Sequence, residues 1–219
     1  MELNTLKINE IFCSIQGEGR NIGKPSIFVR TTGCNYRCDF CDTKYALDGK
    51  GKQYTVEQLI EECKKYNCNH IVFTGGEPLL QKDFSRFTHS FTMYTEGRYT
   101  LELETNGSIY DSNIPGQFKL INVSPKFQYY CLDYKRTLMK WSMFSDFKYV
   151  IQTTQDIELA KEISDECKPN HSIVMREGNT KKSQLDHMDW LIKNTKYIFP
   201  EAQIIPRLHC ILYNGVRRK

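Results

Sequence analysis

The stretch PSIFVRTTGCNYRCDFCDT, residues 25–43, decides the fold of this 219-residue chain. Its first seven residues, Pro25–Thr31, are mostly apolar and β-branched and predict a buried strand. The strand runs into a loop with three cysteines within eight residues, Cys34, Cys38 and Cys41. Thiols this close together are reactive partners or ligands, and an odd number leaves one without a disulfide mate. We therefore expect a strand whose end carries a thiolate site.

The bulk composition is that of an ordinary globular protein. Hydrophobic residues make up 40% and charged residues 26% of the chain, and the net charge of +4 is too mild to indicate a nucleic-acid partner. The basic run at residues 216–219 is typical of a solvated end. Residues 1–12 lack the apolar core of a signal peptide, and no apolar run is long enough to span a membrane. We expect a cytoplasmic protein without a membrane partner, in which clustered cysteines mean metal or catalysis rather than disulfides.

Strands and helices alternate outward from the cysteine loop (residues 34–43). Five further strand segments are expected: HIVFTGGEP (70–78), YTLELETNG (99–107), FKLINVSPK (118–126), FKYVIQ (147–152) and SIVMREG (172–178). Four helices are expected between them: VEQLIEECKKY (56–66), residues 79–94, DIELAKEISDEC (156–167) with Asp156 as its cap, and SQLDHMDWLIKN (183–194). Residues 126–141 are assigned no element, and Cys131 within them is expected to be buried.

This alternation indicates parallel β-α units. About six units are too few for an eight-stranded closed barrel. The predicted fold is therefore α/β, a partial, open (β/α) barrel with parallel strands. The unusual motifs all follow predicted strands: the cysteine loop, TGGEP (74–78), ETNG (104–107) and VSPK (123–126). Because parallel strands end on one side of the sheet, we expect these motifs to form one site.

The C-x3-C-x2-C spacing of the cysteine loop leaves two ligand hypotheses open. An iron–sulfur cubane held by three thiolates keeps one iron free for another ligand. The alternative is zinc with a distant fourth ligand. Cys63 lies on the apolar side of its predicted helix and is expected to pack there, while Cys68 and Cys13 lack the C-x2-C pattern of structural zinc sites. The spacing favours the cluster.

The cysteine loop, with Phe40 just before the last cysteine, resembles that of radical S-adenosylmethionine (SAM) enzymes, and TGGEP strengthens the likeness. The resemblance implies a [4Fe–4S] cluster on Cys34, Cys38 and Cys41 whose open iron binds the amino and carboxylate groups of SAM. An electron from the cluster then yields a 5′-deoxyadenosyl radical. The cofactor carries this chemistry, and the protein positions it and excludes water.

Residues 10–43, EIFCSIQGEGRNIGKPSIFVRTTGCNYRCDFCDT, resemble the start of the 7-carboxy-7-deazaguanine synthase family, and TGGEP, ETNG and VSPK recur in that family's order. The likeness is specific to about Lys126 and looser beyond. It implies ring contraction of 6-carboxy-5,6,7,8-tetrahydropterin to 7-carboxy-7-deazaguanine with loss of ammonia, a step of queuosine biosynthesis. It also implies Mg²⁺, an electron donor such as flavodoxin or ferredoxin, and a homodimer. From the mild net charge we expect no direct nucleic-acid partner.

The resemblance assigns roles to individual residues. It implies that Gln16 and Glu18, with Gly19, bind the pterin edge, and that Arg30 pairs with the substrate carboxylate, a task suited to a planar guanidinium. Thr43 would give its hydroxyl to Mg²⁺, which keeps few protein ligands. The residues implied to line the cofactor are Phe40, Gly75, Gly76, Glu77, Glu104, Asn106, Ser124 and Lys126.

Each of these residues has a structural alternative. SIQGEG and TNG are also turn sequences, Arg30 is also typical of a solvated strand end, and Thr43 is also typical of a turn. Taken singly, the structural alternative is favoured for each. Their joint placement after parallel strands, in one order, favours the functional interpretation.

We expect one radical SAM domain over residues 1–219. It comprises a substrate-binding segment with the first strand (1–33), the cysteine loop (34–43) and a pocket-closing tail (200–219). The family commonly ends near PQ.HK, where this chain has Arg207 and Cys210 at variant positions and keeps Pro206 and His209. His209 is a candidate substrate ligand, and Arg207 adds positive charge near a carboxylate-bearing substrate.

Two rival functions remain at this point. A glycyl-radical-enzyme activase also carries C-x3-C-x2-C but lacks the SIQGEG and FVR elements. A metal-stabilised nucleic-acid-binding module predicts a basic stripe with interleaved aromatic residues, whereas the thirteen tyrosines and twelve phenylalanines here are scattered among the strands.

Overall fold

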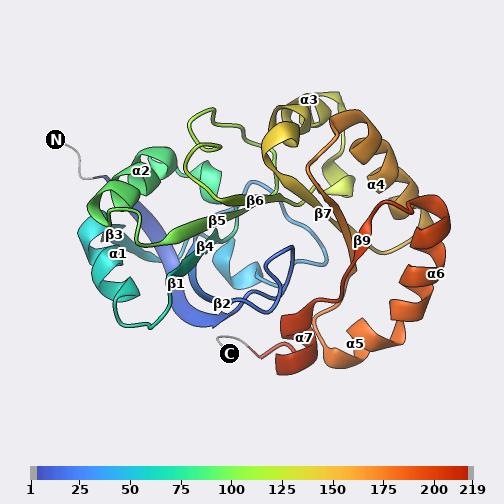
Figure 1. Ribbon diagram of the computed structural model, residues 1–219, viewed down its shortest axis with the longest axis horizontal. Helices are drawn as coiled ribbons and strands as arrows, with labels where there is room; N and C mark the ends of the chain where they lie inside the picture. The colour runs from blue at the N-terminus through green and yellow to red at the C-terminus, as the bar shows by residue number, and fades with distance from the viewer. Residues whose placement is uncertain (1–3, 217–219) are drawn as a thin grey trace.

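One curled sheet organises the computed structural model, which describes residues 4–216. Within those residues nine strands pair in the order β3-β1-β2-β4-β5-β6-β7-β8-β9. Figure 1 shows the curl, with β9 far from β1 and the barrel left open. The strands are β1 (Thr5–Ile15), β2 (Pro25–Thr31), β3 (Lys52–Thr55), β4 (His70–Thr74), β5 (Thr100–Thr105), β6 (Leu120–Val123), β7 (Asp146–Ile151), β8 (Ser172–Arg176) and β9 (Gln203–Ile204).

All neighbours from β2 to β9 are parallel, which confirms the predicted open (β/α) barrel. The six predicted strand segments correspond to β2 and β4–β8. β1 and β3 were not predicted; they add an antiparallel edge to β2. In β1, Leu6 and Ile8 are buried and alternate with half-buried polar residues, so the period of two is present in its first half.

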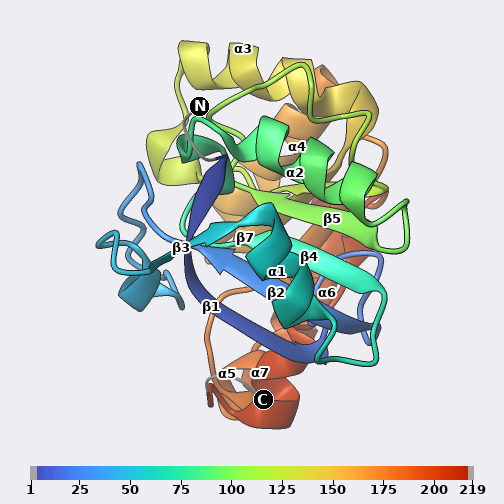
Figure 2. The same cartoon turned by 90° about the vertical axis from the view of Figure 1, so that its left-hand side faces the viewer.

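Most helices cover the outer side of the sheet. The helices are α1 (Val56–Cys63), α2 (Phe84–Tyr94), α3 (Leu132–Trp141), α4 (Thr154–Cys167), α5 (Lys181–Asp186), α6 (Met188–Ile198) and α7 (Leu208–Tyr213). Helix α7 instead lies beside the cavity at the ends of the strands and packs on α5. Figure 2 shows α1 and α2 in front of the strands they cover. Phe73 of β4 packs edge-on against Phe84 and Phe91 of α2, with ring centroids 5.7 and 6.4 Å apart, and this apolar layer fixes the sheet from outside.

Several predicted boundaries differ from the structure. The helix expected over 79–94 begins at Phe84, because a short 3₁₀ turn at Pro78–Leu80 precedes it. The helix expected over 183–194 is two helices, α5 and α6, interrupted at His187. In α4 the N-cap is Thr153, and Asp156 accepts its backbone N–H as the third helical residue of a capping box.

The segment without a predicted element contains α3. Its buried residues Tyr134, Leu138 and Trp141 follow a helical spacing. Cys131, expected to be buried, is exposed just before the helix, so that prediction is wrong. Cys63 is buried, as predicted from its place on α1.

Two further expectations from the sequence concern the basic run near the end of the chain and the absence of a membrane-spanning helix. Of the basic run at residues 216–219, residues 217–219 lie outside the described part of the chain. Among the helices of residues 4–216, none combines the length and the apolarity needed to cross a membrane.

Candidate active site

A cavity of about 390 Å³ opens where the parallel strands end. It brings together fifteen of the residues predicted for the site: Gln16, Glu18, Arg30, Cys34, Cys38, Phe40, Cys41, Thr43, Gly75, Gly76, Glu104, Asn106, Ser124, Lys126 and His209. Gly19 and Glu77 lie outside its lining. The C-terminal ends of the strands, as in other parallel β/α folds, therefore gather the polar side chains into one place.

The cysteine loop forms one wall of the cavity. Its thiols are half-buried, and two backbone N–H groups point at sulfur: Tyr36 N lies 3.4 Å from Cys34 Sγ, and Thr43 N lies 3.4 Å from Cys41 Sγ. Tyr36 stacks on Tyr129 with ring centroids 4.0 Å apart, which anchors the loop to the segment before α3. Hydrogen bonds to ligating sulfurs are a usual means of tuning an iron–sulfur cluster.

The thiols fit a cluster better than a single ion. Among residues 4–216, no three His, Cys, Asp or Glu side chains gather closely enough to hold one metal ion. The three sulfurs instead border a shared cavity, as a cubane with several irons requires. Burial raises the pKa of the Cys34 and Cys38 thiols, so iron bound there would have to stabilise their thiolate forms.

The TGGEP turn lies against the cysteine loop. A Cβ at Gly76 would stand 2.1 Å from the Gly33 carbonyl oxygen and 2.8 Å from Cys34 Cβ, so the approach requires glycine. Glu77 is fully buried and accepts hydrogen bonds from the Thr105 hydroxyl (2.7 Å) and from the backbone N–H of Asn106 (2.7 Å). Its carboxylate therefore ties the end of β4 to the end of β5.

The connection between β1 and β2, residues 16–24, forms the floor of the cavity. This floor loop enters the hollow of the curled sheet, which can be followed in Figure 1. Arg20 Nε meets Asp146 Oδ2 at 2.5 Å, and Asn21 Nδ2 donates to Glu102 Oε2 at 2.5 Å. These contacts hold the loop so that Gln16 and Glu18 face the cavity, while Gly19 lies beside Asn122 below it.

A chain of alternating positive and negative side chains connects the floor loop to the neighbouring elements. Lys148 Nζ lies 2.5 Å from Glu104 Oε2 and 2.9 Å from Glu18 Oε2. Glu18 Oε1 in turn lies 2.8 Å from Arg207 Nε, and Arg207 also pairs with Asp42 next to the last cysteine. The chain of five charges joins the floor loop, two strands, the tail and the cysteine loop.

These contacts set the ionisation of the two cavity-facing glutamates differently. Burial opposes the charge on Glu18, but Lys148 and then Arg207 outweigh it and hold the pKa of Glu18 well below its usual value. Burial dominates at Glu104 and raises the pKa of that carboxyl to about 7, although Lys148 acts in the opposite direction. The floor thus contains one firmly ionised carboxylate and one that titrates near neutrality.

Arg30 lies at the rim of the cavity and already forms an ion pair with Glu10. Its Nε donates to Glu10 Oε1 at 2.8 Å, and its guanidinium stands 5.9 Å from the ring centres of Phe12 and Tyr45. The side chain still lines the cavity. Glu10, on the strand that was not predicted, therefore orients a residue that the sequence did identify.

The tail closes the cavity from the side. Arg207 donates to Asn179 Oδ1 (3.0 Å) as well as pairing with Glu18, and Leu208 N donates to the Gly17 carbonyl (2.9 Å). His209 packs so closely on Gly17 that a Cβ there would stand 2.0 Å from Nδ1. Burial lowers the pKa of His209, which favours its neutral form. The variant position 210 holds a buried cysteine.

Three further predicted residues make side-chain hydrogen bonds at the cavity. Thr43 is buried and donates its hydroxyl hydrogen to Asp42 Oδ1 at 2.6 Å. Lys126 Nζ donates to Ser124 Oγ at 2.7 Å, and burial lowers the pKa of Lys126. Sequence reasoning missed Lys148. Its signal was a lysine inside the apolar run FKYVI of a strand expected to be buried.

Comparison with known proteins agrees with this geometry. A family model described as the radical SAM superfamily matches residues 28–123. A 7-carboxy-7-deazaguanine synthase from Aquifex aeolicus is 32% identical over 215 residues, covering 93% of this chain and 92% of the relative. One from Thermoplasma acidophilum is 32% identical over 213 residues, covering 95% and 98%.

Among solved structures, QueE from Escherichia coli superimposes with a TM-score of 0.71 over 94% of this chain and 95% of that one, at 21% identity. That likeness shows the shared fold. The relatives do not favour an activase or a nucleic-acid-binding module. With about a third of its residues identical over nearly the whole length of two such enzymes, this chain belongs to the 7-carboxy-7-deazaguanine synthase family, within the radical SAM superfamily.

Proposed function

We propose that this protein converts 6-carboxy-5,6,7,8-tetrahydropterin to 7-carboxy-7-deazaguanine with loss of ammonia, a carbon–nitrogen lyase reaction of queuosine biosynthesis. The observation that carries the proposal is the cavity itself. It joins a three-thiol wall to a floor of oriented carboxylates and an amide. The wall suits a radical-generating cofactor, and the floor suits a ring rich in N–H donors.

Membership of the radical SAM superfamily implies a [4Fe–4S] cluster and SAM. When bound, they supply a 5′-deoxyadenosyl radical able to abstract a hydrogen atom from the substrate. Cys34, Cys38 and Cys41 would hold the cluster. The residues proposed to position SAM beside it are Phe40, Gly75, Gly76, Glu77, Glu104, Asn106, Ser124 and Lys126. Glu77 would act through the backbone that it ties, because its carboxylate is buried behind the lining.

Substrate recognition is assigned to the floor and the rim. Gln16 and Glu18 would hydrogen-bond the pterin edge, and Gly19 would let the floor loop pass beneath it. Arg30 would pair with the substrate carboxylate through the guanidinium N–H groups that Glu10 leaves available. His209, held neutral by burial, would close the pocket over the ring.

Thr43 would contribute its hydroxyl to a Mg²⁺ ion that completes its coordination with substrate oxygens and water. The support is that Thr43 is buried and lines the same cavity as Arg30. The reductant would be a small redox protein such as flavodoxin or ferredoxin, and the active form would be a homodimer. Mg²⁺-dependent turnover in wild type that Thr43→Ala abolishes would support the metal assignment.

The direct test is anaerobic reconstitution followed by incubation with the tetrahydropterin, SAM and a reductant. We expect about four irons per chain and product of the mass of 7-carboxy-7-deazaguanine, with one ammonia released per product. Omitting SAM serves as the control and should abolish product. A protein with a full cluster that cleaves SAM yet leaves the tetrahydropterin unchanged would refute the proposed substrate.

A further inference from the structure

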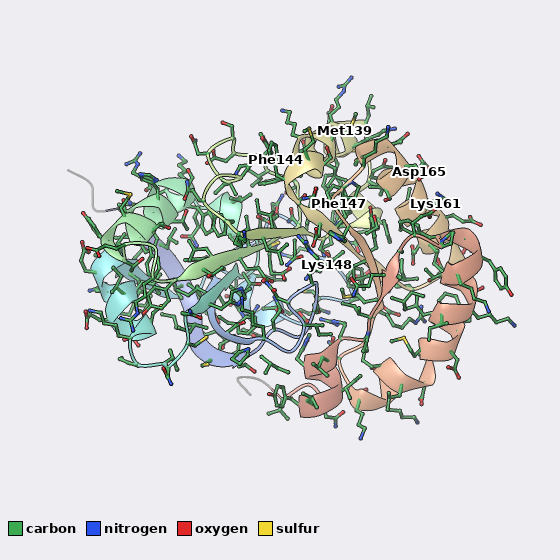
Figure 3. The ribbon with its side chains drawn as sticks, in the orientation of Figure 1. Met139, Phe144, Phe147, Lys148, Lys161 and Asp165 are labelled. Atoms are coloured by element: carbon green, nitrogen blue, oxygen red, sulfur yellow. The ribbon has the colours of Figure 1, made fainter. Side chains whose placement is uncertain are left out.

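Lys148 lies at the centre of the barrel, away from the motifs that identify the family. The alternation of β7 sends Phe147 and Tyr149 into the apolar layer beneath the helices, whereas Lys148 points to the hollow of the sheet (Figure 3). Its side chain is 3% exposed. Burying a lysine destabilises the folded protein unless its charge is paired. The groups that pair with Lys148 therefore indicate its role.

Its partners are two carboxylates that face the cavity from different elements. Glu18 comes from the floor loop and Glu104 from β5, and each places one oxygen within 2.9 Å of Lys148 Nζ. Their other oxygens are held by Arg207 at Glu18 and by Gln16 Nε2 (3.2 Å) at Glu104. Both side chains are therefore fixed in orientation before any ligand binds.

We infer that Lys148 is a positioning residue for substrate: it holds the Glu18 carboxylate ionised, favours the ionised form of Glu104, and aims both so that they accept hydrogen bonds from the N–H groups of an aminopyrimidinone ring. This inference rests on the proposed function and deepens it. An ionised carboxylate only accepts hydrogen bonds, whereas a protonated one also presents an O–H donor. A ring edge with adjacent N–H groups requires acceptors, so the ionisation of the floor decides whether the ring is recognised.

The charges around Lys148 show why its removal would matter. Besides Glu18 and Glu104, four other charged or titratable groups interact electrostatically with Lys148 or with one of these two carboxylates. They are Glu102, Lys126, His209 and Arg207. Burial already raises the pKa of Glu104 to about 7 with Lys148 in place. Without that cation, the mutual repulsion of buried carboxylates would raise it further and protonate the floor at neutral pH.

The experiment measures binding of oxidised pterin-6-carboxylate to anaerobically reconstituted enzyme without reductant, by calorimetry, so that turnover is not needed. Lys148→Met is expected to weaken binding about tenfold or more, one pKa unit being a tenfold change in protonation. Iron content and SAM binding should stay as in wild type. Raising the pH from 7 to 9 should recover part of the binding in the variant, because the carboxylates ionise again, and should change wild type less.

Two variants separate positioning from folding. Lys148→Met with Glu104→Gln removes a positive and a negative charge together, and is expected to recover thermal stability but not pterin binding. Lys161→Met is the matched control, since Lys161 lies outside the barrel on α4, 3.0 Å from Asp165 (Figure 3). It should bind pterin as wild type does.

The outcomes distinguish this inference from the proposed function. If Lys148→Met, or the double variant where the single one does not fold, binds the pterin as tightly as wild type across this pH range, Lys148 has no positioning role. If wild type turns over the tetrahydropterin while the Lys148 variants lose kcat with unchanged KM, the inference fails and the function stands. If wild type itself neither binds nor converts the pterin, the proposed function fails.

Discussion

The cysteine loop and the floor loop border one cavity but are held by different kinds of contact. The cysteine loop has exposed residues such as Arg37. It is anchored by the stack of Tyr36 on Tyr129 and by side-chain hydrogen bonds of Asn35. An ion pair of Asp42 with Arg207 adds to these contacts. The floor loop is tied to buried charges, among them Asp146 and Glu102. A loop with few buried contacts is expected to be ordered by its ligand, whereas a buried ionic network is ordered by the fold. We therefore expect the floor loop, the proposed recognition surface, to be pre-formed, and the cysteine loop to become ordered when it binds its proposed cofactor.

The strongest test of that difference removes a thiol. Cys38→Ala is expected to lower turnover by at least about 10³-fold, because two thiolates do not hold the cluster that generates the radical. Iron content, visible absorbance and product formation measure it after anaerobic reconstitution. Pterin binding to the floor should persist in the same variant, because the floor network is intact.

Cys131→Ala is the matched control for that experiment. Cys131 is exposed, lies just before α3 and is outside the cavity lining. It should keep iron and activity. Retention of a full cluster and normal turnover by Cys38→Ala would contradict the assignment of the thiol wall.

Arg207 joins the two regions, since it pairs with Asp42 of the cysteine loop and Glu18 of the floor loop. Arg207→Met should lower the free energy of unfolding by about 3 kcal/mol, the cost of leaving buried carboxylates without their cation. We expect turnover to fall about tenfold or more as the cavity loses its shape. Urea unfolding and steady-state kinetics measure the two effects.

Arg207→Gln introduces the glutamine that the resemblance to the PQ.HK segment implies for this position. It should be milder than Arg207→Met, because an amide still donates to Glu18. Equal losses of stability and turnover in both variants would show that the positive charge of Arg207, and not its hydrogen bonding, holds the two loops. No loss in either would show that the tie between the two loops contributes nothing.

The contrast between the cysteine loop and the floor loop also explains which parts of the site could be predicted from the sequence. The cysteine loop and TGGEP are contiguous motifs, so the sequence alone was enough to predict their residues and chemistry. The floor draws Glu18, Lys148 and Arg207 from segments far apart in the chain, and no local pattern links them. The position of Lys148 inside an apolar strand was a local signal, but its partners emerge only when β5, β7 and the floor loop meet.

The fold likewise contains elements that a local sequence pattern predicted and elements that it did not. Mostly apolar runs identified β2, β4, β6, β7 and β8, because parallel strands are buried on both faces. The alternation of Leu101 and Leu103 with acidic residues identified β5. β1 was missed because Thr5, Lys7 and Asn9 are polar, and because the buried position 10 holds a charged glutamate that pairs with Arg30. β9, with two residues, has no periodicity to detect. α3 had a readable helical spacing in Tyr134, Leu138 and Trp141, but it was not recognised within a tyrosine-rich segment.

Acid titration tests the ionic character of the floor. The pKa of Glu18 is lowered in the folded protein, so its contribution to stability is present above its unfolded pKa near 4.5 and is lost as the pH falls toward the folded value. Glu18→Gln should cost about 2 kcal/mol at pH 7, and this difference from wild type should shrink below pH 4.5. Urea unfolding across the pH range measures it.

Asp165→Asn, in the exposed pair with Lys161, provides the comparison for this titration. Its effect should stay within about 0.5 kcal/mol at every pH, as for other surface ion pairs. A pH-independent difference for Glu18→Gln would mean that Glu18 stabilises the floor by packing rather than by charge.

The smallest expected effect concerns a single hydrogen bond at the cysteine loop. Tyr129 accepts the backbone N–H of Arg37 through its hydroxyl at 2.8 Å, and Tyr129→Phe removes that bond while keeping the ring stacked on Tyr36. The loss should be about 1 kcal/mol and local. Hydrogen exchange should therefore quicken at the amides of residues 34–43 in protein without cluster, and should stay unchanged in residues 16–24. Tyr129→Ala also removes the stack and should quicken it further. If exchange of the floor loop rises in step with the cysteine loop, the two regions open as one unit and the proposed division between a pre-formed floor and a ligand-ordered wall is wrong.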